Sequence, residues 1–229
     1  MRALLAPVFA LALALAGLFA PATATPPRDW RDAVTRTPAG AFVIGNPAAR
    51  VKLVEYGSYT CSHCADFARE SRAVLKDAMV RSGSTSLEYR HLVRDGVDMA
   101  AAILARCTGP AGFFATSEAI FDAQNRWLPR AMDYQQANAA RLQSYPRLAQ
   151  LRALADGSGL TALVQARGLS AARTDACFAD EAEVDRVIQM TRAAPDSITG
   201  TPSFFINGQA TPMGGWARIE PALRAKGAR

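Results

Sequence analysis

Hydrophobic and polar positions follow three successive patterns in the first half of the chain. Residues 49–58, "ARVKLVEYGS", are rich in Val and Leu and predict a strand buried on both faces. Residues 62–80 place apolar side chains at helical spacing, and Thr60 is the expected N-cap. Residues 84–93 predict a second strand. A strand, a helix and a strand at this spacing predict a βαβ unit with parallel neighbours.

The second half of the chain has a different pattern. Residues 97–194 are mostly helical in pattern, with too few strand signals for a second sheet. Residues 201–208, "TPSFFING", predict a strand that ends in an Asn-Gly turn and returns antiparallel. An earlier strand is predicted at "GAFVIG" (40–45) and a last helix at "WARIEPALRAK". This order predicts the α/β class, with a mixed central sheet flanked by helices and a large helical insertion.

The first residues indicate export. Arg2 is followed by an apolar run, and Ala22-Thr23-Ala24 forms a small-x-small cleavage site, as in a secretory signal peptide. An uncleaved membrane anchor is the alternative, because the run is close to the roughly 18 residues that a span needs. The cleavage site and Pro21 favour a signal peptide over residues 1–24. We therefore expect a periplasmic protein.

Composition and charge narrow the class of protein. Half of the residues are hydrophobic, which is enough for a core, and the remaining length suits one domain with an insertion. The formal net charge of +6 comes from Arg spread along the chain without a basic run. A solvated surface is the better interpretation of this charge than nucleic-acid binding.

Four cysteines follow the signal segment, and an oxidising compartment allows them to form disulfides. Four cysteines permit three full pairings. The short spacing of Cys61 and Cys64 makes one pairing natural, in which Cys107 and Cys177 form the other bridge. The alternative for Cys107 and Cys177 is two free buried thiols.

The Cys-x-x-Cys pair carries the candidate chemistry. Cys61 falls at the first turn of the predicted helix, where unpaired backbone N–H groups and the helix dipole stabilise a thiolate. Such stabilisation lowers the thiol pKa and makes the disulfide more oxidising. Cys64, one turn further on, would be the resolving thiol. The ring of His63 is a candidate donor to the Cys61 sulfur, and the alternative is an exposed histidine without a role.

Glu55 is the second candidate, because it interrupts an apolar strand six residues before Cys61. A buried carboxyl is costly unless it is neutral, paired or hydrated. We expect it to accept the proton of Cys64; the alternative is a strand-end glutamate in water. A zinc site is less favoured, because structural zinc usually takes four ligands and only one cysteine pair is closely spaced.

Three segments together resemble a known family. "VEYGSYTCSHC", the helical insertion and "TGTPSFFING" are similar to the DsbA-like periplasmic thiol-disulfide oxidoreductases of the thioredoxin superfamily, over residues 40–226. The resemblance implies a thioredoxin fold with Cys61 as nucleophile, Cys64 as resolving cysteine and Glu55 as the buried acid. It also implies a cis peptide bond between Thr201 and Pro202, in a loop that lies against the sulfurs and pairs with the client's backbone. Some relatives have a second, non-catalytic disulfide like that expected for Cys107 and Cys177.

Two departures from the family's strong oxidant leave the direction of the reaction open. Ser62 stands where that oxidant has Pro. Thr201 stands where that oxidant has Val, and a Thr at this position is more typical of the bacterial disulfide isomerases. We expect a monomeric oxidase without a dissociable cofactor or metal, acting on reduced, unfolded exported proteins and reoxidised by a membrane partner of the DsbB type. The alternatives are an isomerase or reductase on the same fold and a thiol-based metal-binding module.

The expected organisation assigns every residue to one of four parts. These are a signal peptide (1–24), an N-terminal extension (25–39), a thioredoxin-fold domain (40–96 and 195–229) and an inserted helical domain (97–194).

Overall fold

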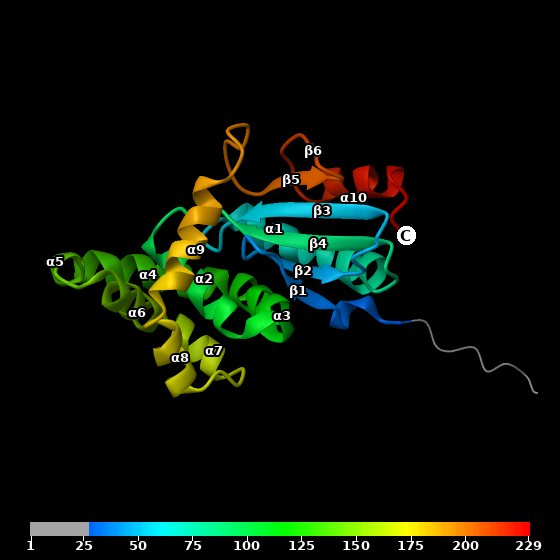
Figure 1. The fold of residues 1–229 in the computed structure, drawn as a ribbon. Coiled ribbons are helices and arrows are strands. Elements are labelled where there is room, and N and C mark those ends of the chain that lie inside the picture. The colour runs from blue at the N-terminus through cyan, green and yellow to red at the C-terminus, as the bar shows by residue number, and fades with distance from the viewer. Residues whose placement is uncertain (1–27) are drawn as a thin grey trace, which may run out of the picture.

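The computed structural model describes residues 28–229, so the predicted signal peptide lies outside the described residues (Figure 1). One sheet and a group of helices make up this part of the chain. The strands are β1 (Val34–Arg36), β2 (Phe42–Gly45), β3 (Val51–Gly57), β4 (Thr85–His91), β5 (Ser203–Ile206) and β6 (Gln209–Ala210). The helices are η1 (Trp30–Asp32, 3-10), α1 (Ser62–Ser71), η2 (Arg72–Val80, π), α2 (Gly96–Cys107), α3 (Gly109–Asp122), α4 (Gln124–Ala137), α5 (Ala139–Gln143), α6 (Arg147–Ser158), α7 (Leu160–Gln165), α8 (Ala171–Cys177), α9 (Glu181–Arg192) and α10 (Trp216–Ala225).

The sheet is mixed and has the strand order β1-β2-β4-β3-β5-β6. The central pair β3 and β4 is parallel, as the sequence predicted, with Glu55 opposite Tyr89. Strand β5 runs antiparallel to β3, and β6 returns antiparallel to β5 through Asn207 and Gly208, which both have positive φ. The predicted Asn-Gly turn is therefore confirmed.

Strand β1 was not predicted. It lies within residues 25–39, which were expected to precede the fold, and it pairs antiparallel with β2 as the edge of the sheet. Its three residues, "VTR", are half-buried or exposed, so they carry almost no hydrophobic pattern from which a strand is recognised.

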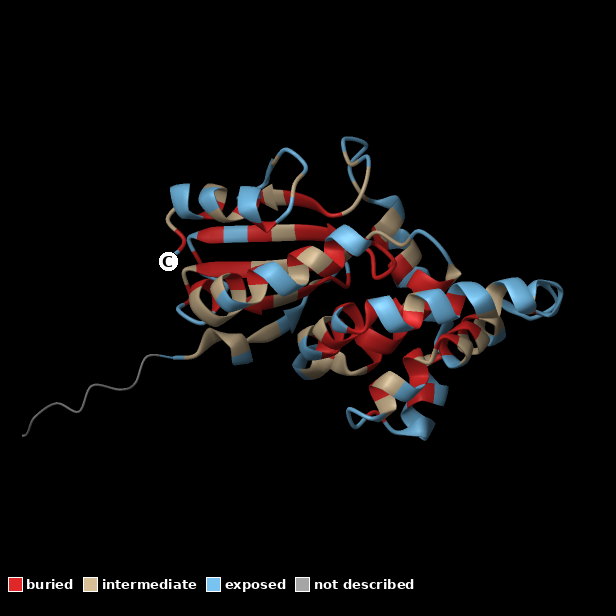
Figure 2. Cartoon of the chain, turned by 180° about the vertical axis from the view of Figure 1, so that it is seen from behind, coloured by how far each residue is buried: buried red, intermediate tan, exposed pale blue. Residues whose placement is uncertain are grey.

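The helices cover the two faces of the sheet unequally. Val51 and Leu53 of β3 are buried against α1, η2 and α10, in a cluster that includes Phe67 and Trp216. On the opposite face of β3, Lys52 is exposed and Val54 is only half-buried, and most of this face is uncovered in the ribbon view (Figure 1). The prediction that this strand is buried on both faces is therefore wrong for its first half. Figure 2 shows the covered face, with the buried strands behind the amphipathic helices.

The inserted helices α2 to α9 shield the end of the sheet from which α1 starts. Phe42 of β2 stacks on Phe113 of α3, with ring centroids 4.1 Å apart. One buried cluster joins these residues with Tyr59 and both cysteines of the pair. Because the insertion and the sheet share this core, the surroundings of the cysteines are built by both.

Candidate active site

The Cys-x-x-Cys pair lies where the central strand passes into a helix. Strand β3 ends at Gly57, and Cys61 is the N-cap of α1, with extended backbone angles (φ −89°, ψ 120°). The prediction that Thr60 caps this helix is wrong. The Thr60 hydroxyl instead accepts a hydrogen bond from Arg94 Nη2 at 2.9 Å, in a polar network before α2.

The surroundings of Cys61 favour a thiolate. They lower the thiol pKa to about 5, chiefly through a hydrogen bond from the Cys64 thiol, with further donation from the Thr201 side chain and the backbone N–H groups of Cys64 and His63. Partial burial opposes this shift. These backbone donors are the unpaired N–H groups of a helix N-terminus, as predicted from the place of Cys61 at the start of the helix.

Cys64 has the opposite character. Its side chain is fully buried, and its pKa is raised far above that of a free thiol, first by desolvation and then by its hydrogen bond to Cys61 and the nearby Glu55 charge. Cys61 and Cys64 are present as free thiols, so the structure describes the dithiol form of the pair. Within one helical turn, the surroundings therefore favour ionisation of the Cys61 sulfur and protonation of the Cys64 sulfur.

Glu55 lies in β3 beneath the pair and is only 4% exposed. Burial raises its pKa to about 8, with a smaller contribution from the Cys61 charge. Its Oε1 atom has no hydrogen-bond partner among residues 28–229. The carboxyl borders a cavity of about 60 Å³ between the sheet, α1, η2 and α3, together with Tyr89 and Ser117. The alternative of a strand-end glutamate in water is therefore wrong.

The loop before β5 comes from far along the chain to complete the site. The peptide bond between Thr201 and Pro202 is cis, as the resemblance implied. The pairing of β5 with β3 brings this loop to the cysteines, and Thr201 O lies 3.2 Å from Cys61 Sγ. Beside it is a groove of about 420 Å³, lined by His63, Asp66, Glu70, Thr201, Pro202, Met213, Gly214 and Gly215.

His63 is exposed at the edge of this groove. In the described part of the chain, no hydrogen bond joins its ring to Cys61, although its backbone N–H acts on that thiol. The backbone N–H of His63, and not its ring, therefore contacts the Cys61 sulfur.

Two further buried polar residues at the site were not predicted. Asp98 of α2 accepts hydrogen bonds from the Ser58 hydroxyl (2.5 Å) and from Tyr59 N (2.7 Å), and burial raises its pKa to about 6. Gln124, the first residue of α4, donates to backbone carbonyls of the same loop. Both belong to polar stretches that are typical of any helix start, so nothing in their local sequence distinguishes them.

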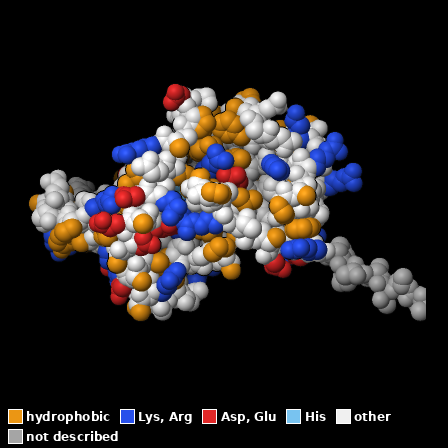
Figure 3. Space-filling view, in the orientation of Figure 1, with side chains coloured by type: hydrophobic (Ala, Val, Ile, Leu, Met, Phe, Trp, Pro, Cys, Tyr) orange, Lys and Arg blue, Asp and Glu red, His pale blue; other side chains and the backbone are white. Residues whose placement is uncertain are grey.

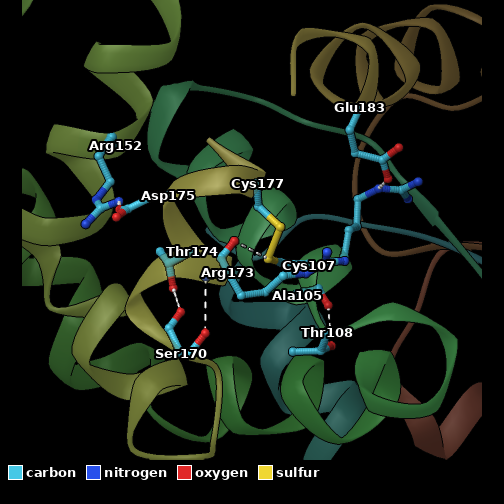
Figure 4. Close-up of a disulfide and its surroundings, with 11 residues drawn as sticks. Ala105, Cys107, Thr108, Arg152, Ser170, Arg173, Thr174, Asp175, Cys177 and Glu183 are labelled. Atoms are coloured by element: carbon cyan, nitrogen blue, oxygen red, sulfur yellow. Dashed lines mark hydrogen bonds and ion pairs between the residues drawn. A yellow bond between two sulfur atoms is a disulfide. The ribbon is translucent and has the colours of Figure 1, made fainter. Parts of the chain in front are cut away.

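The other cysteine pair forms a disulfide, as expected, with an S–S distance of 2.01 Å. Cys107 ends α2 and Cys177 ends α8, so the bridge ties two inserted helices together (Figure 4). Ser170 caps the start of α8, and Arg152 of α6 pairs with Asp175 beside the bridge. The alternative of two free thiols is not what the structure contains.

Two features of residues 28–229 bear on metal binding and membrane insertion. No group of three or more His, Cys, Asp or Glu side chains is arranged to hold a metal ion in this range. None of its helices has the length and hydrophobicity required to cross a bilayer. Lys and Arg side chains are dispersed over the visible surface and interspersed with acidic groups (Figure 3).

A family model and several solved structures are similar to this chain. A family model described as thioredoxin matches residues 37–219. A crystal structure of a protein-disulfide isomerase from Novosphingobium aromaticivorans is similar, with 33% identity and a TM-score of 0.75, covering 80% of this chain and 95% of that one. Wolbachia pipientis alpha-DsbA1 shares the fold at 21% identity, with a TM-score of 0.63, covering 80% of this chain and 88% of that one.

Curated relatives are longer than this chain. A Rickettsia typhi protein, provisionally named a protein-disulfide oxidoreductase, is 29% identical over 173 residues, which are 74% of this chain and 56% of the relative. The chain thus spans about half the length of the curated relatives it matches.

Proposed function

We propose that this chain, which belongs to the thioredoxin family whose model it matches, is a thiol-disulfide oxidoreductase that acts as a dithiol oxidase. Its reaction would introduce disulfides into other proteins by exchange through Cys61 and Cys64. The relatives named as disulfide oxidoreductase and disulfide isomerase support the reaction class. No dissociable cofactor is required, because the two electrons exchanged are stored in the cysteine pair.

The observation that carries this proposal is the opposite shift of the two thiol pKa values. Cys61 is held as a thiolate above pH about 5, while Cys64 stays protonated. Stabilising the thiolate stabilises the reduced pair, and a pair that is more stable when reduced is a stronger oxidant. The site is therefore suited to oxidising client dithiols to disulfides.

The reaction balances with these groups alone. A client thiolate attacks Cys61 Sγ of the oxidised pair, the Cys61–Cys64 bond breaks, and Cys64 leaves with the bonding electrons and takes up a proton. A second client thiolate then attacks the client sulfur of the mixed disulfide, and Cys61 leaves as a thiolate. The client loses two electrons and two protons; the enzyme gains both electrons and one proton, at Cys64, and the other proton passes to solvent.

Glu55 is the proposed proton donor and acceptor for Cys64. A carboxyl with a pKa of about 8 is mostly protonated at neutral pH and can supply a proton to the departing Cys64 sulfur. In the reverse direction it accepts that proton when Cys64 attacks. Its burial, without a hydrogen-bond partner for Oε1 in the described residues, and the effect of its charge on the Cys64 pKa support this role.

Clients and compartment follow from the expected export. We propose that the protein acts in the periplasm on reduced, unfolded exported proteins, as a monomer. A membrane protein of the DsbB type would accept its electrons and restore the disulfide. The signal-peptide pattern of residues 1–24 and the disulfide between Cys107 and Cys177 support an oxidising compartment.

A disulfide isomerase is the second candidate. The similar Novosphingobium protein carries that name, and Thr201 precedes the cis-proline. An isomerase would use the Cys61 thiolate of the reduced pair to attack a wrong client disulfide. The same ionised sulfur serves both reactions, so the equilibrium potential must distinguish them.

The deciding experiment is the reduction potential of the Cys61–Cys64 couple in glutathione buffers, followed by mass spectrometry of alkylated peptides. We expect a value much nearer to about −120 mV, typical of a strong oxidant, than to about −270 mV, typical of a reductant. A value near the reducing end would overturn the oxidase proposal. Oxidation of a reduced dithiol peptide, compared with rearrangement of a mispaired one, then measures the two activities directly.

A further inference from the structure

Gln124 links the helical insertion to the backbone of the nucleophile. Its Nε2 atom donates to Tyr59 O at 2.7 Å and to Cys61 O at 2.9 Å, across 65 and 63 residues of sequence. The residue is only 7% exposed. A side-chain amide nitrogen has two hydrogens, so these two bonds use its whole donor capacity. A buried amide fully committed to two carbonyls of one loop holds that loop tightly.

The two carbonyls belong to the turn that orients the Cys61 sulfur. Cys61 O also accepts the first backbone bond of the α1 region, from Ala65 N at 3.2 Å. The N–H groups of His63 and Cys64, which act on the thiolate, belong to the same turn. A small rotation of these peptide groups changes how the donors meet the sulfur, because hydrogen bonds weaken steeply with angle.

Tyr59 is held by the insertion at three points. Its N–H donates to Asp98 of α2 at 2.7 Å, its carbonyl accepts from Gln124 of α4, and its hydroxyl lies 2.6 Å from the Ser117 hydroxyl of α3. The ring is completely buried. Three inserted helices therefore contact the residue two positions before the nucleophile. Within residues 28–229, Gln124 is the one inserted side chain that also hydrogen-bonds the nucleophile, at its carbonyl.

We propose that Gln124 is a positioning residue through which the helical insertion holds the Cys61 thiolate in its reactive orientation. This inference rests on the proposed thiol-disulfide chemistry and assigns the insertion a part in it beyond covering the site. Without the two donors, the turn relaxes and the thiolate loses part of its stabilisation. The substitution does not alter the side chains of Cys64 and Thr201, which also donate to Cys61.

The test uses the reduced full chain with Gln124→Met, which keeps the length of the side chain but removes both donors. We expect the Cys61 pKa, read from thiolate absorbance against pH, to rise by about one unit, which is a tenfold change in the ratio of thiolate to thiol. Alkylation of Cys61 near pH 5 should slow several-fold, and the couple should become more reducing.

Trp127→Phe is the matched control. Trp127 lies three residues further along α4, is also buried, and donates its Nε1 hydrogen to Ile120 O at 2.7 Å, within the insertion. Its loss should lower stability without moving the Cys61 pKa. Equal pKa shifts in both variants would overturn the proposal, because they would reflect general loosening of α4. An unchanged pKa in a folded Gln124→Met protein would overturn it as well.

A measurement on the unaltered protein keeps the proposal testable if the variant does not fold. The side-chain N–H protons of Gln124 should exchange with solvent far more slowly than those of exposed glutamines. Exchange at the exposed rate would refute the two bonds. The pKa difference between variants is independent of the absolute potential, so a reducing wild-type potential would refute the oxidase proposal and leave this inference standing.

Discussion

The chain has two cysteine pairs whose surroundings differ in almost every respect. Cys61 and Cys64 are three residues apart, begin a helix and are free thiols, whereas Cys107 and Cys177 are 70 residues apart and bonded to each other. Cys61 lies at the N-terminus of α1, but Cys107 and Cys177 are the last residues of α2 and α8. One pair is therefore at the positive end of a helix dipole and the other at two negative ends.

This difference accounts for two kinds of sulfur chemistry in one protein. A helix N-terminus stabilises a thiolate, so it favours the reduced pair, while helix C-termini disfavour a thiolate and so favour the bonded state. The second pair also closes a long loop, which restricts the unfolded chain. The same residue type thus serves exchange at one end of a helix and stability at the other.

The largest expected effect separates the pairs by activity. Cys61→Ser should reduce peptide oxidation to the uncatalysed rate, because no other cysteine among residues 28–229 has a lowered thiol pKa. The double variant Cys107→Ser/Cys177→Ser should retain activity within a few-fold at a temperature where it is folded. Stopped-flow oxidation of a reduced dithiol peptide measures both. Full activity in Cys61→Ser would refute the assignment of the nucleophile.

The second effect separates the pairs by stability. Opening a loop of 70 residues by Cys107→Ser/Cys177→Ser should lower the free energy of unfolding by about 4 kcal/mol, on a chain-entropy estimate. Cys61→Ser/Cys64→Ser should not lower it by a comparable amount. Urea denaturation of both variants makes the comparison. Equal losses would mean that the distant bridge stabilises no more than the short one.

Glu55→Gln tests how far the buried carboxyl lowers the free energy of unfolding. The folded-state pKa of about 8 lies above the unfolded value of about 4.3, so stability should fall as pH rises between these values and level off above pH 8. The variant should lose this slope and gain about 2–4 kcal/mol at pH 7. Denaturation of the reduced wild-type and variant proteins from pH 4.5 to 8 measures it, since the titration of Cys61 contributes to the slope in both. A parallel slope in the variant would contradict the shift.

Glu55→Gln should also slow the chemistry, because the amide cannot exchange a proton with Cys64. The step to measure is the attack of Cys64 on a preformed mixed disulfide at Cys61. Unchanged kinetics would remove Glu55 from the proposed mechanism.

The smallest expected effect is that of His63→Ala. The ring is exposed, and exposed charge interactions contribute at most about 1 kcal/mol, so the Cys61 pKa should rise by only a few tenths of a unit. Thiolate absorbance against pH measures the shift. A rise of more than one unit would indicate that the ring contacts the sulfur in solution.

Local patterns were sufficient for much of the architecture and for the reacting residues. The central strand, the helix after it and the Asn-Gly turn all depend on neighbours within a few positions, so their signals are present in short segments. The Cys-x-x-Cys spacing and the interrupting Glu55 were recognisable in the same way. The edge strand β1 was missed because edge residues bury too little to show a pattern.

The long-range contacts were decided only when the chain folded. Thr201 reaches Cys61 across 140 residues because β5 pairs with β3, and Gln124 reaches the same cysteine because α4 begins beside the loop. No local pattern encodes such an encounter, since hydrogen bonds between distant residues depend on how all the elements pack together. Residue types and their short spacings established which groups could react and which sulfur lies at the helix start, whereas packing determined how deeply Cys64 and Glu55 are buried and which distant group holds the turn in place.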